Sequence, residues 1–219
     1  MIKKGAAVSG VLIAVMAAIS LYGFAAIPEG MMIARHWNLS GAADGFSPRN
    51  HVLIGTPVLA ALLSLLFMAI PSIDPRRDNV RRSSGLFLGA WIGAVTLLAL
   101  IHALIVLAAA ANGEPDPRII VTAVAALFLV LGNFMAKSRS SWFIGLRTPW
   151  TLSSEHAWMA ANRASGWLFA LTGLVALAAA WLFDAKLGFY ALFAGAVASA
   201  AVGVSVSYFA WRADPERPR

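Results

Sequence analysis

The chain has 219 residues, of which 60% are hydrophobic and only 12% are charged, with a mean hydropathy of +0.76. About 25% of residues are charged in soluble domains, so the composition excludes an ordinary soluble domain and favours an integral membrane protein. The absence of cysteine excludes disulfides, thiolate metal sites and cysteine nucleophiles. The net charge of +7 is compatible with nucleic-acid binding, but the placement of the charges argues against it.

Six apolar runs follow one another along the chain, and each is close to the roughly 20 residues that a helix needs to cross a bilayer. They comprise residues 5–27, 52–70, 86–111, 119–136, 166–183 and 189–211. Lys3 and Lys4 before the first run also fit a secretory signal peptide, but that run is longer than a short signal core. Small residues recur every four positions in three runs, which allows helices to pack closely in lipid. The sequence therefore predicts an all-α membrane bundle of six transmembrane helices.

Two residues inside these runs, Pro57 and His102, are unusual in a membrane-spanning helix. We expect Pro57 in the first turns of the second helix, where proline costs least. His102 is the one ionisable side chain well inside a run, and a lone histidine there is more often hydrogen-bonded to a neighbouring helix than part of a proton relay. Because no run contains Asp, Glu, Lys or Arg, an ion-coupled transporter is disfavoured.

The basic residues predict the orientation of the bundle through the positive-inside rule. With a cytoplasmic N-terminus, only Arg35, Arg49, Arg118 and Lys186 of the 17 Lys and Arg residues lie outside. Both termini and the segment 137–166 are then cytoplasmic, and the loop 28–51 is external. The inside set contains Lys3, Lys4, Arg76, Arg77, Arg81, Arg82, Lys137, Arg139, Arg147, Arg163, Arg212, Arg217 and Arg219.

The external loop holds the side chains Glu29, His36, Asn38 and Asp44, which are able to bind a polar ligand or, less specifically, a metal. His36 and Asp44 are eight residues apart with turn residues between them, unlike the spacing that puts two ligands on one helix face. Asn38 and Asp44 also fit turn residues that bond their own backbone. A structured recognition loop is therefore favoured over a metal site, and no cofactor is indicated.

The cytoplasmic segment reads as an ordered turn at residues 145–150, followed by a helix with Ser153 as its N-cap and Glu155 in its first turn. One interpretation is an interfacial helix whose tryptophans lie at headgroup depth and whose arginines contact lipid phosphates. The other is a hydrogen-bonded partner-binding site. Its candidate residues are Asn133, Arg147, Trp150, Glu155, Trp158, Asn162 and Arg163.

Two stretches resemble a known family. The run Leu131-Gly132-Asn133, the run from Trp142 to Glu155 (WFIGLRTPWTLSSE) and Trp158 are similar to the signature of the SdpI family of bacterial multi-pass immunity proteins. The external loop, with Ile27-Pro28-Glu29, His36-Trp37-Asn38, Gly41 and Asp44-Gly45-Phe46, resembles the small domain of unknown function that often precedes it. Where many relatives have Pro-Asn, this chain has Ser140-Ser141-Trp142.

The resemblance implies two units, residues 1–85 with the external His-Trp-Asn loop and residues 86–219 as an SdpI-like four-helix unit. It implies a protein of the bacterial plasma membrane that protects against a membrane-active toxic peptide outside and sequesters a small repressor inside, without binding nucleic acid itself. The residues leave open a small-solute transporter or channel, or a membrane enzyme that uses the external His36 and Asp44, although the common hydrolase, zinc-protease and phosphate-loop motifs are absent. Membrane lipid is a further expected partner.

Overall fold

A computed structural model describes residues 1–38 and 40–216 of the chain, so Arg217 and Arg219 of the predicted cytoplasmic set lie outside the described residues. Six helices in this part of the chain are long and apolar enough to cross a membrane, which confirms the predicted six-helix bundle. They are α1 (Ile2–Ala26), α2 (Arg49–Ile73), α4 (Ser84–Ala110), α5 (Pro117–Met135), α7 (Glu155–Leu182) and α8 (Ala185–Ala213).

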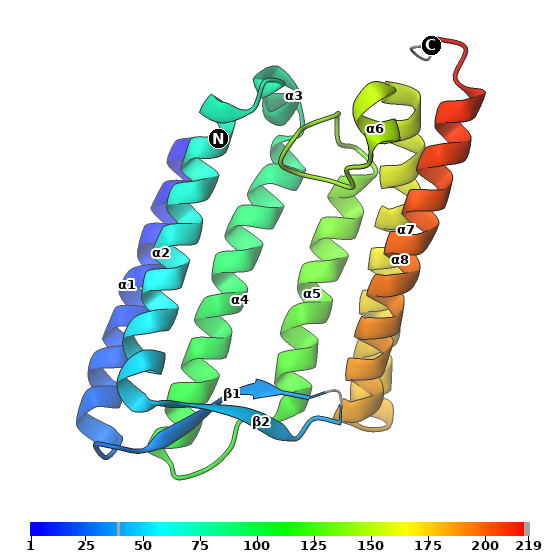
Figure 1. Cartoon of the computed structure of the whole chain (residues 1–219). Coiled ribbons are helices and arrows are strands. Elements are labelled where there is room, and N and C mark those ends of the chain that lie inside the picture. The colour runs from blue at the N-terminus through cyan, green and yellow to red at the C-terminus, as the bar shows by residue number, and fades with distance from the viewer. Residues whose placement is uncertain (39, 217–219) are drawn as a thin grey trace.

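The six long helices run side by side, and the shorter elements lie at the two ends of the bundle (Figure 1). Helix α3 (Arg77–Arg82), helix α6 (Pro149–Ser153), the start of α1 and the end of α8 are at one end. The strands β1 (Met32–Trp37) and β2 (Ala43–Pro48) form an antiparallel hairpin at the other end. The segment predicted to be cytoplasmic and the loop predicted to be external are thus at opposite ends of the bundle.

By packing, the helices form two groups of three. The first core joins α1, α2 and α4 through Met16, Ala60, Phe87 and Trp91, whose side chains are buried. A second core, which includes Val121 and other small buried residues, joins α5, α7 and α8. Helix α4 packs against α1 and α2 as well as α5 and so links the groups, whereas α2 and α8 make no contact within the described residues. The unit boundary proposed at residue 85 stays a prediction.

Helix α2 begins three residues before the predicted run, which corrects the expectation for Pro57. The proline lies in the third turn, inside the helix, and not in its first turns. Because proline has no N–H, the carbonyl of Leu53 lacks its usual helical partner. The hydroxyl of Ser20 on α1 donates to that carbonyl at 2.6 Å. The Ser20 hydroxyl oxygen also lies 3.0 Å from Nε2 of His102 on α4. Ser20 therefore links α1 to both α2 and α4, and His102 is hydrogen-bonded to a neighbouring helix as predicted.

The two strands were not predicted. Ile33 is buried in a cluster with Ile27, Val52 and Val106, so the hairpin packs on the ends of α1, α2 and α4. Figure 1 shows the hairpin extending across the end of the bundle beneath α4 and α5. A Cβ placed on Gly41 at its tip would lie 3.9 Å from the ring of Phe189 in α8, so the hairpin reaches from the first helix group to the second.

Charge differs strongly between the two ends. The end with both termini has the eleven described members of the predicted cytoplasmic set and five acids, a net +6. These acids are Asp74, Asp78, Glu155, Asp214 and Glu216. The hairpin end has four basic residues and five acids, a net −1. The basic residues thus cluster at one end, as a positive-inside arrangement requires.

Candidate functional site

Residues 137–154, hereafter the crossing segment, run from the end of α5 over the bundle to the start of α7 (Figure 1). Local chemistry fixes its second half. Thr148 caps α6 and forms a capping box with Thr151, and Pro149 occupies the first helical position. The hydroxyl of Thr148 also donates to Ser207 of α8 at 3.0 Å. The turn predicted at residues 145–150 is therefore an ordered turn that leads into a short helix.

The cap of α7 corrects one prediction. Ser154, and not Ser153, is the N-cap, and its hydroxyl accepts a hydrogen bond from the backbone N–H of Ala157 at 3.0 Å. Ser153 is the last residue of α6. Glu155 lies in the first turn as predicted, where the helix dipole favours a negative charge. Its carboxylate is 3.6 Å from the guanidinium of Arg139 at the exposed surface.

Asn162 and Trp158 fix the middle of the crossing segment from inside the bundle. The amide oxygen of Asn162 accepts from the backbone N–H of Leu146 at 2.8 Å, and the indole of Trp158 donates to the carbonyl of Ser138 at 3.1 Å. Both side chains are buried. Gly145 has φ +107° and lies against Trp158, so a left-handed backbone and a close approach both require glycine there. These two candidate residues therefore hold the segment in place.

A second anchor comes from the connection between α2 and α4, and sequence reasoning missed it. Asp74, at the end of α2, is 3% exposed. Its carboxylate accepts from the Ser141 hydroxyl at 2.8 Å, from the Trp142 N–H at 3.1 Å and from the Arg76 N–H at 2.7 Å. Because charged acceptors make the stronger protein hydrogen bonds, Asp74 is a firm attachment for the crossing segment.

Neighbouring residues extend this attachment. The guanidinium of Arg76 donates to the Ser140 hydroxyl and, at 2.6 Å, to the carbonyl of Leu152. Asn79 donates to the carbonyl of Ser140 at 2.9 Å, and the hydroxyl of Ser83 accepts from the Arg139 N–H at 2.8 Å. We call the set of Asp74, Arg76, Asn79, Ser83 and the residues of the crossing segment that they bond the polar junction. It uses Ser140 and Ser141 of the crossing segment.

The remaining candidates of the segment predicted to be cytoplasmic are spread around this end. Arg147 is exposed, and its Nη1 donates to the carbonyl of Trp142 at 2.9 Å. Trp150 is partly buried and contacts the ring of Tyr208 edge-on, with the centroids 5.1 Å apart. Arg163 is exposed on α7. Asn133 is exposed on α5, 3.5 Å from the Lys137 ammonium, in a cavity of about 190 Å³ between α5 and α7.

The structure does not join these candidates into the hydrogen-bonded cluster that the sequence suggested. Within the described residues, no hydrogen bond or ion pair links any two members of the set Asn133, Arg147, Glu155, Asn162 and Arg163. The physical reason is burial: Asn162 faces inward to the segment's backbone, while the charged members face solvent. Their role in binding stays a prediction.

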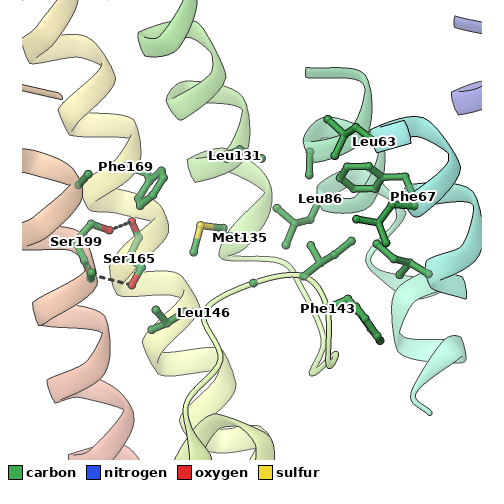
Figure 2. A pocket seen from close by; sticks show the side chains of 17 residues that line it. Leu63, Phe67, Leu86, Leu131, Met135, Phe143, Leu146, Ser165, Phe169 and Ser199 are labelled. Carbon is green, nitrogen blue, oxygen red and sulfur yellow. Dashed lines mark hydrogen bonds between the residues drawn. The ribbon is translucent and has the colours of Figure 1, made fainter. Parts of the chain in front are cut away.

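An apolar cavity of about 490 Å³ lies directly beneath the crossing segment (Figure 2). Residues 143–146 cover it, and side chains from α2, α4, α5, α7 and α8 form its walls. Figure 2 shows Phe67 and Leu86 on one side and Phe169 on the other. No sequence pattern indicated this cavity, because its lining residues come from segments that are far apart along the chain.

At the opposite end, the hairpin places His36 and Asp44 together. The His36 Nδ1 and the Asp44 carboxylate are 2.5 Å apart, with side-chain exposures of 71% and 43%. Gly45 faces His36 across the strands, where a Cβ would come within 2.8 Å of the His36 Cβ. Asn38 proves to be a turn residue, since its amide oxygen accepts from the N–H groups of Ser40 and Ala42.

The weak metal candidates do not come together as a set. Glu29 is exposed in the turn between α1 and β1. Among the described residues, no group of three or more His, Cys, Asp or Glu side chains is placed to hold a metal ion. The exposed pair of His36 and Asp44 therefore presents an imidazole and a carboxylate to a polar partner, with Asn38 fixing the shape of the turn beside them.

Comparison with known proteins connects the crossing segment to a family. The model of the SdpI/YfhL protein family matches residues 137–208, which comprise the crossing segment, α7 and most of α8. No curated protein and no solved structure matches the chain. The family match begins where the polar junction attaches the crossing segment to the first helix group.

Proposed function

Since this chain belongs to the SdpI/YfhL protein family through its residues 137–208, we propose that it is a membrane immunity-type protein of the bacterial plasma membrane. In this proposal the hairpin recognises a membrane-active toxic peptide outside the cell. The crossing segment holds a small repressor protein inside. The protein itself does not contact nucleic acid.

One observation carries the proposal: α2 joins the two candidate sites directly. The helix begins at Arg49, next to the last residue of the hairpin, and ends beside Asp74, which bonds the crossing segment. Its 25 residues span roughly 37 Å at 1.5 Å per residue, close to the full thickness of a bilayer. In this proposal a tilt or shift of α2 at the hairpin displaces the polar junction, because one helix, interrupted by Pro57 and Pro71 but by no loop, joins the two.

The surfaces at the two ends suit these roles. The exposed His36 and Asp44 supply polar groups for a peptide backbone or side chain at the hairpin. At the crossing segment, exposed Arg147 lies beside Trp142, which is 51% exposed. Arginine and tryptophan are both among the residue types enriched where proteins bind one another. The net +6 at this end supports its placement in the cytoplasm.

A growth assay in the native host tests the proposal and does not require the toxin to be identified. The gene is deleted, and the strain is complemented with the wild type, Arg147→Ala or Arg118→Ala. Growth is measured in medium conditioned by wild-type cells. Arg118 is the matched control, because it is a basic residue at the opposite end, in the first turn of α5.

We expect the deletion strain to stop growing in conditioned medium, and the wild type and Arg118→Ala to restore growth. Arg147→Ala should insert into the membrane at the wild-type level and fail to restore growth, because the partner loses its exposed guanidinium. A deletion strain that grows normally in conditioned medium would refute the immunity role. Full protection by Arg147→Ala would remove the crossing segment from it.

A further inference from the structure

The cavity beneath the crossing segment opens to the side of the bundle. Its edges are α2 and α8, and its floor is formed by α4 and α5. Within the described residues α2 and α8 do not pack against each other, so the cavity lies between two helices whose backbones are far apart. In a bundle whose six helices cross the bilayer, this opening faces the acyl chains of the lipid.

The interior of the cavity is suited only to an apolar ligand. Its two polar side chains, Ser165 and Ser199, are satisfied by each other's backbone (Figure 2). The Ser165 hydroxyl donates to the carbonyl of Ser199 at 3.2 Å, and the Ser199 hydroxyl donates to the carbonyl of Ser165 at 3.0 Å. Both hydroxyl donors are thus used within the protein, and the rest of the lining is predominantly apolar, so a polar solute would lose most of its hydrogen bonds there.

The size of the cavity distinguishes between two apolar ligands, a lipid acyl chain and a peptide helix. A volume of about 490 Å³ is within the range of small-ligand sites. A helix about 10 Å wide with a 5.4 Å pitch fills roughly 420 Å³ in each turn. The cavity thus encloses little more than the volume of one turn, so a spanning peptide helix would lie mostly outside it. A narrow, flexible hydrocarbon chain fits this volume.

Charge at the covered end selects the headgroup. Arg147 directly follows the lining residues 143–146, and its guanidinium returns to the carbonyl of Trp142 on their other side. The cation therefore lies alongside the stretch that covers the cavity. Among the described contacts it uses only Nη1, which leaves the other N–H groups for a phosphate. Basic pockets between helices at the cytoplasmic side are typical sites for anionic lipid headgroups.

We propose that this cavity binds one acyl chain of an anionic phospholipid, with the lipid phosphate held by Arg147. The site is a structural and regulatory lipid site that goes beyond the proposed immunity role. Because it uses the Arg147 guanidinium that is also proposed to meet the repressor, lipid and repressor compete for this side chain, and the experiment on the purified protein measures lipid retention alone. A bound chain fills the space between the two helix groups directly beneath the crossing segment, so its presence or absence bears on the position of that segment.

Native mass spectrometry of the full chain in detergent tests this proposal. The protein is titrated with phosphatidylglycerol or phosphatidylcholine of identical acyl chains, and the retained lipid is counted. The variants are Arg147→Gln and Ala200→Phe. Ala200 lines the cavity and is exposed, so phenylalanine enters the cavity without displacing the core. Ala198→Phe is the matched control, since Ala198 is also exposed but lies about 200° around α8 at 3.6 residues per turn.

We expect one phosphatidylglycerol to be retained at concentrations at which phosphatidylcholine is lost. Arg147→Gln should weaken that retention about fivefold, the effect of one basic residue next to an anionic lipid. Ala200→Phe should abolish it, and Ala198→Phe should leave it unchanged. Equal retention of both lipids, retention by Ala200→Phe at the wild-type level, or displacement of the lipid by a stoichiometric apolar helical peptide would each overturn the proposal.

Discussion

Replacing Asp74 with alanine tests the polar junction most sharply. The carboxylate is 3% exposed and accepts three hydrogen bonds, two of them from Ser141 and Trp142 of the crossing segment. Hydrogen bonds to a charged group contribute about 1.5–3 kcal/mol each, and groups left unpaired in a buried site add to the cost. Because bonds to one carboxylate are not additive, we expect Asp74→Ala to destabilise the fold by about 3–5 kcal/mol in total.

The control is Asp78→Ala, four residues away. The Asp78 carboxylate is 76% exposed and lies 3.6 Å from the guanidinium of Arg81. An exposed pair of this kind contributes below about 0.5 kcal/mol, so this variant should unfold like the wild type. Both substitutions remove one carboxylate from the same connection, which isolates the buried hydrogen bonds as the difference between them.

Two measurements in detergent follow the effect of Asp74→Ala. Thermal unfolding monitored by tryptophan fluorescence should shift to lower temperature. Hydrogen exchange of the backbone amides at residues 140–143 should accelerate, because the Trp142 N–H loses its acceptor. Exchange in the middle of the long helices should stay slow. If Asp74→Ala matched Asp78→Ala in both measurements, the polar junction would not hold the crossing segment, and the coupling through α2 would have no physical basis.

Two further substitutions test the packing that positions the sites, each by thermal unfolding in detergent. Gly145→Ala should lower the free energy of unfolding by about 1–3 kcal/mol, because φ is +107° and the new Cβ would lie 2.7 Å from the Trp158 ring. An unchanged unfolding temperature would contradict the described backbone. Ser20→Ala should lower the free energy of unfolding by about 1–2 kcal/mol, because the carbonyl of Leu53 is then unpaired in the apolar interior of the bundle. Ser205→Ala, which removes only an exposed bond within α8, should be neutral, and an equal loss in both serine variants would exclude a special role for Ser20.

The membrane helices were predictable because their signal is local. A run of about 20 apolar residues determines a spanning helix whatever it packs against, and all six were confirmed. Helix ends were predicted less accurately. The predicted N-cap of α7 was one residue too early, because two serines are adjacent there. Helix α2 begins earlier than predicted, so Pro57 lies in its interior. The strands were missed because Ala-Asp-Gly-Phe-Ser-Pro has little strand propensity, and packing on the helix ends supports the hairpin.

The site was predictable only in part, because most of its contacts join residues that are far apart in the sequence. Asn162 was singled out by its place on α7, but its hydrogen bond to Leu146 was not foreseen. The polar junction had no signal at all, since Asp74 reaches Ser141 across 67 residues and each looks like an ordinary loop residue on its own. The cavity arises from five helices and one loop, and no stretch of sequence contains it.

The central claim is that the hairpin is outside the cell while the crossing segment is inside. Because the chain has no cysteine, single cysteines report on this directly. We place them at two exposed serines, Ser40→Cys in the hairpin turn and Ser153→Cys at the end of α6, and apply a membrane-impermeant maleimide. We expect Ser40→Cys to react in intact cells and Ser153→Cys to react only after the cells are opened. Labelling of Ser153→Cys in intact cells would contradict it.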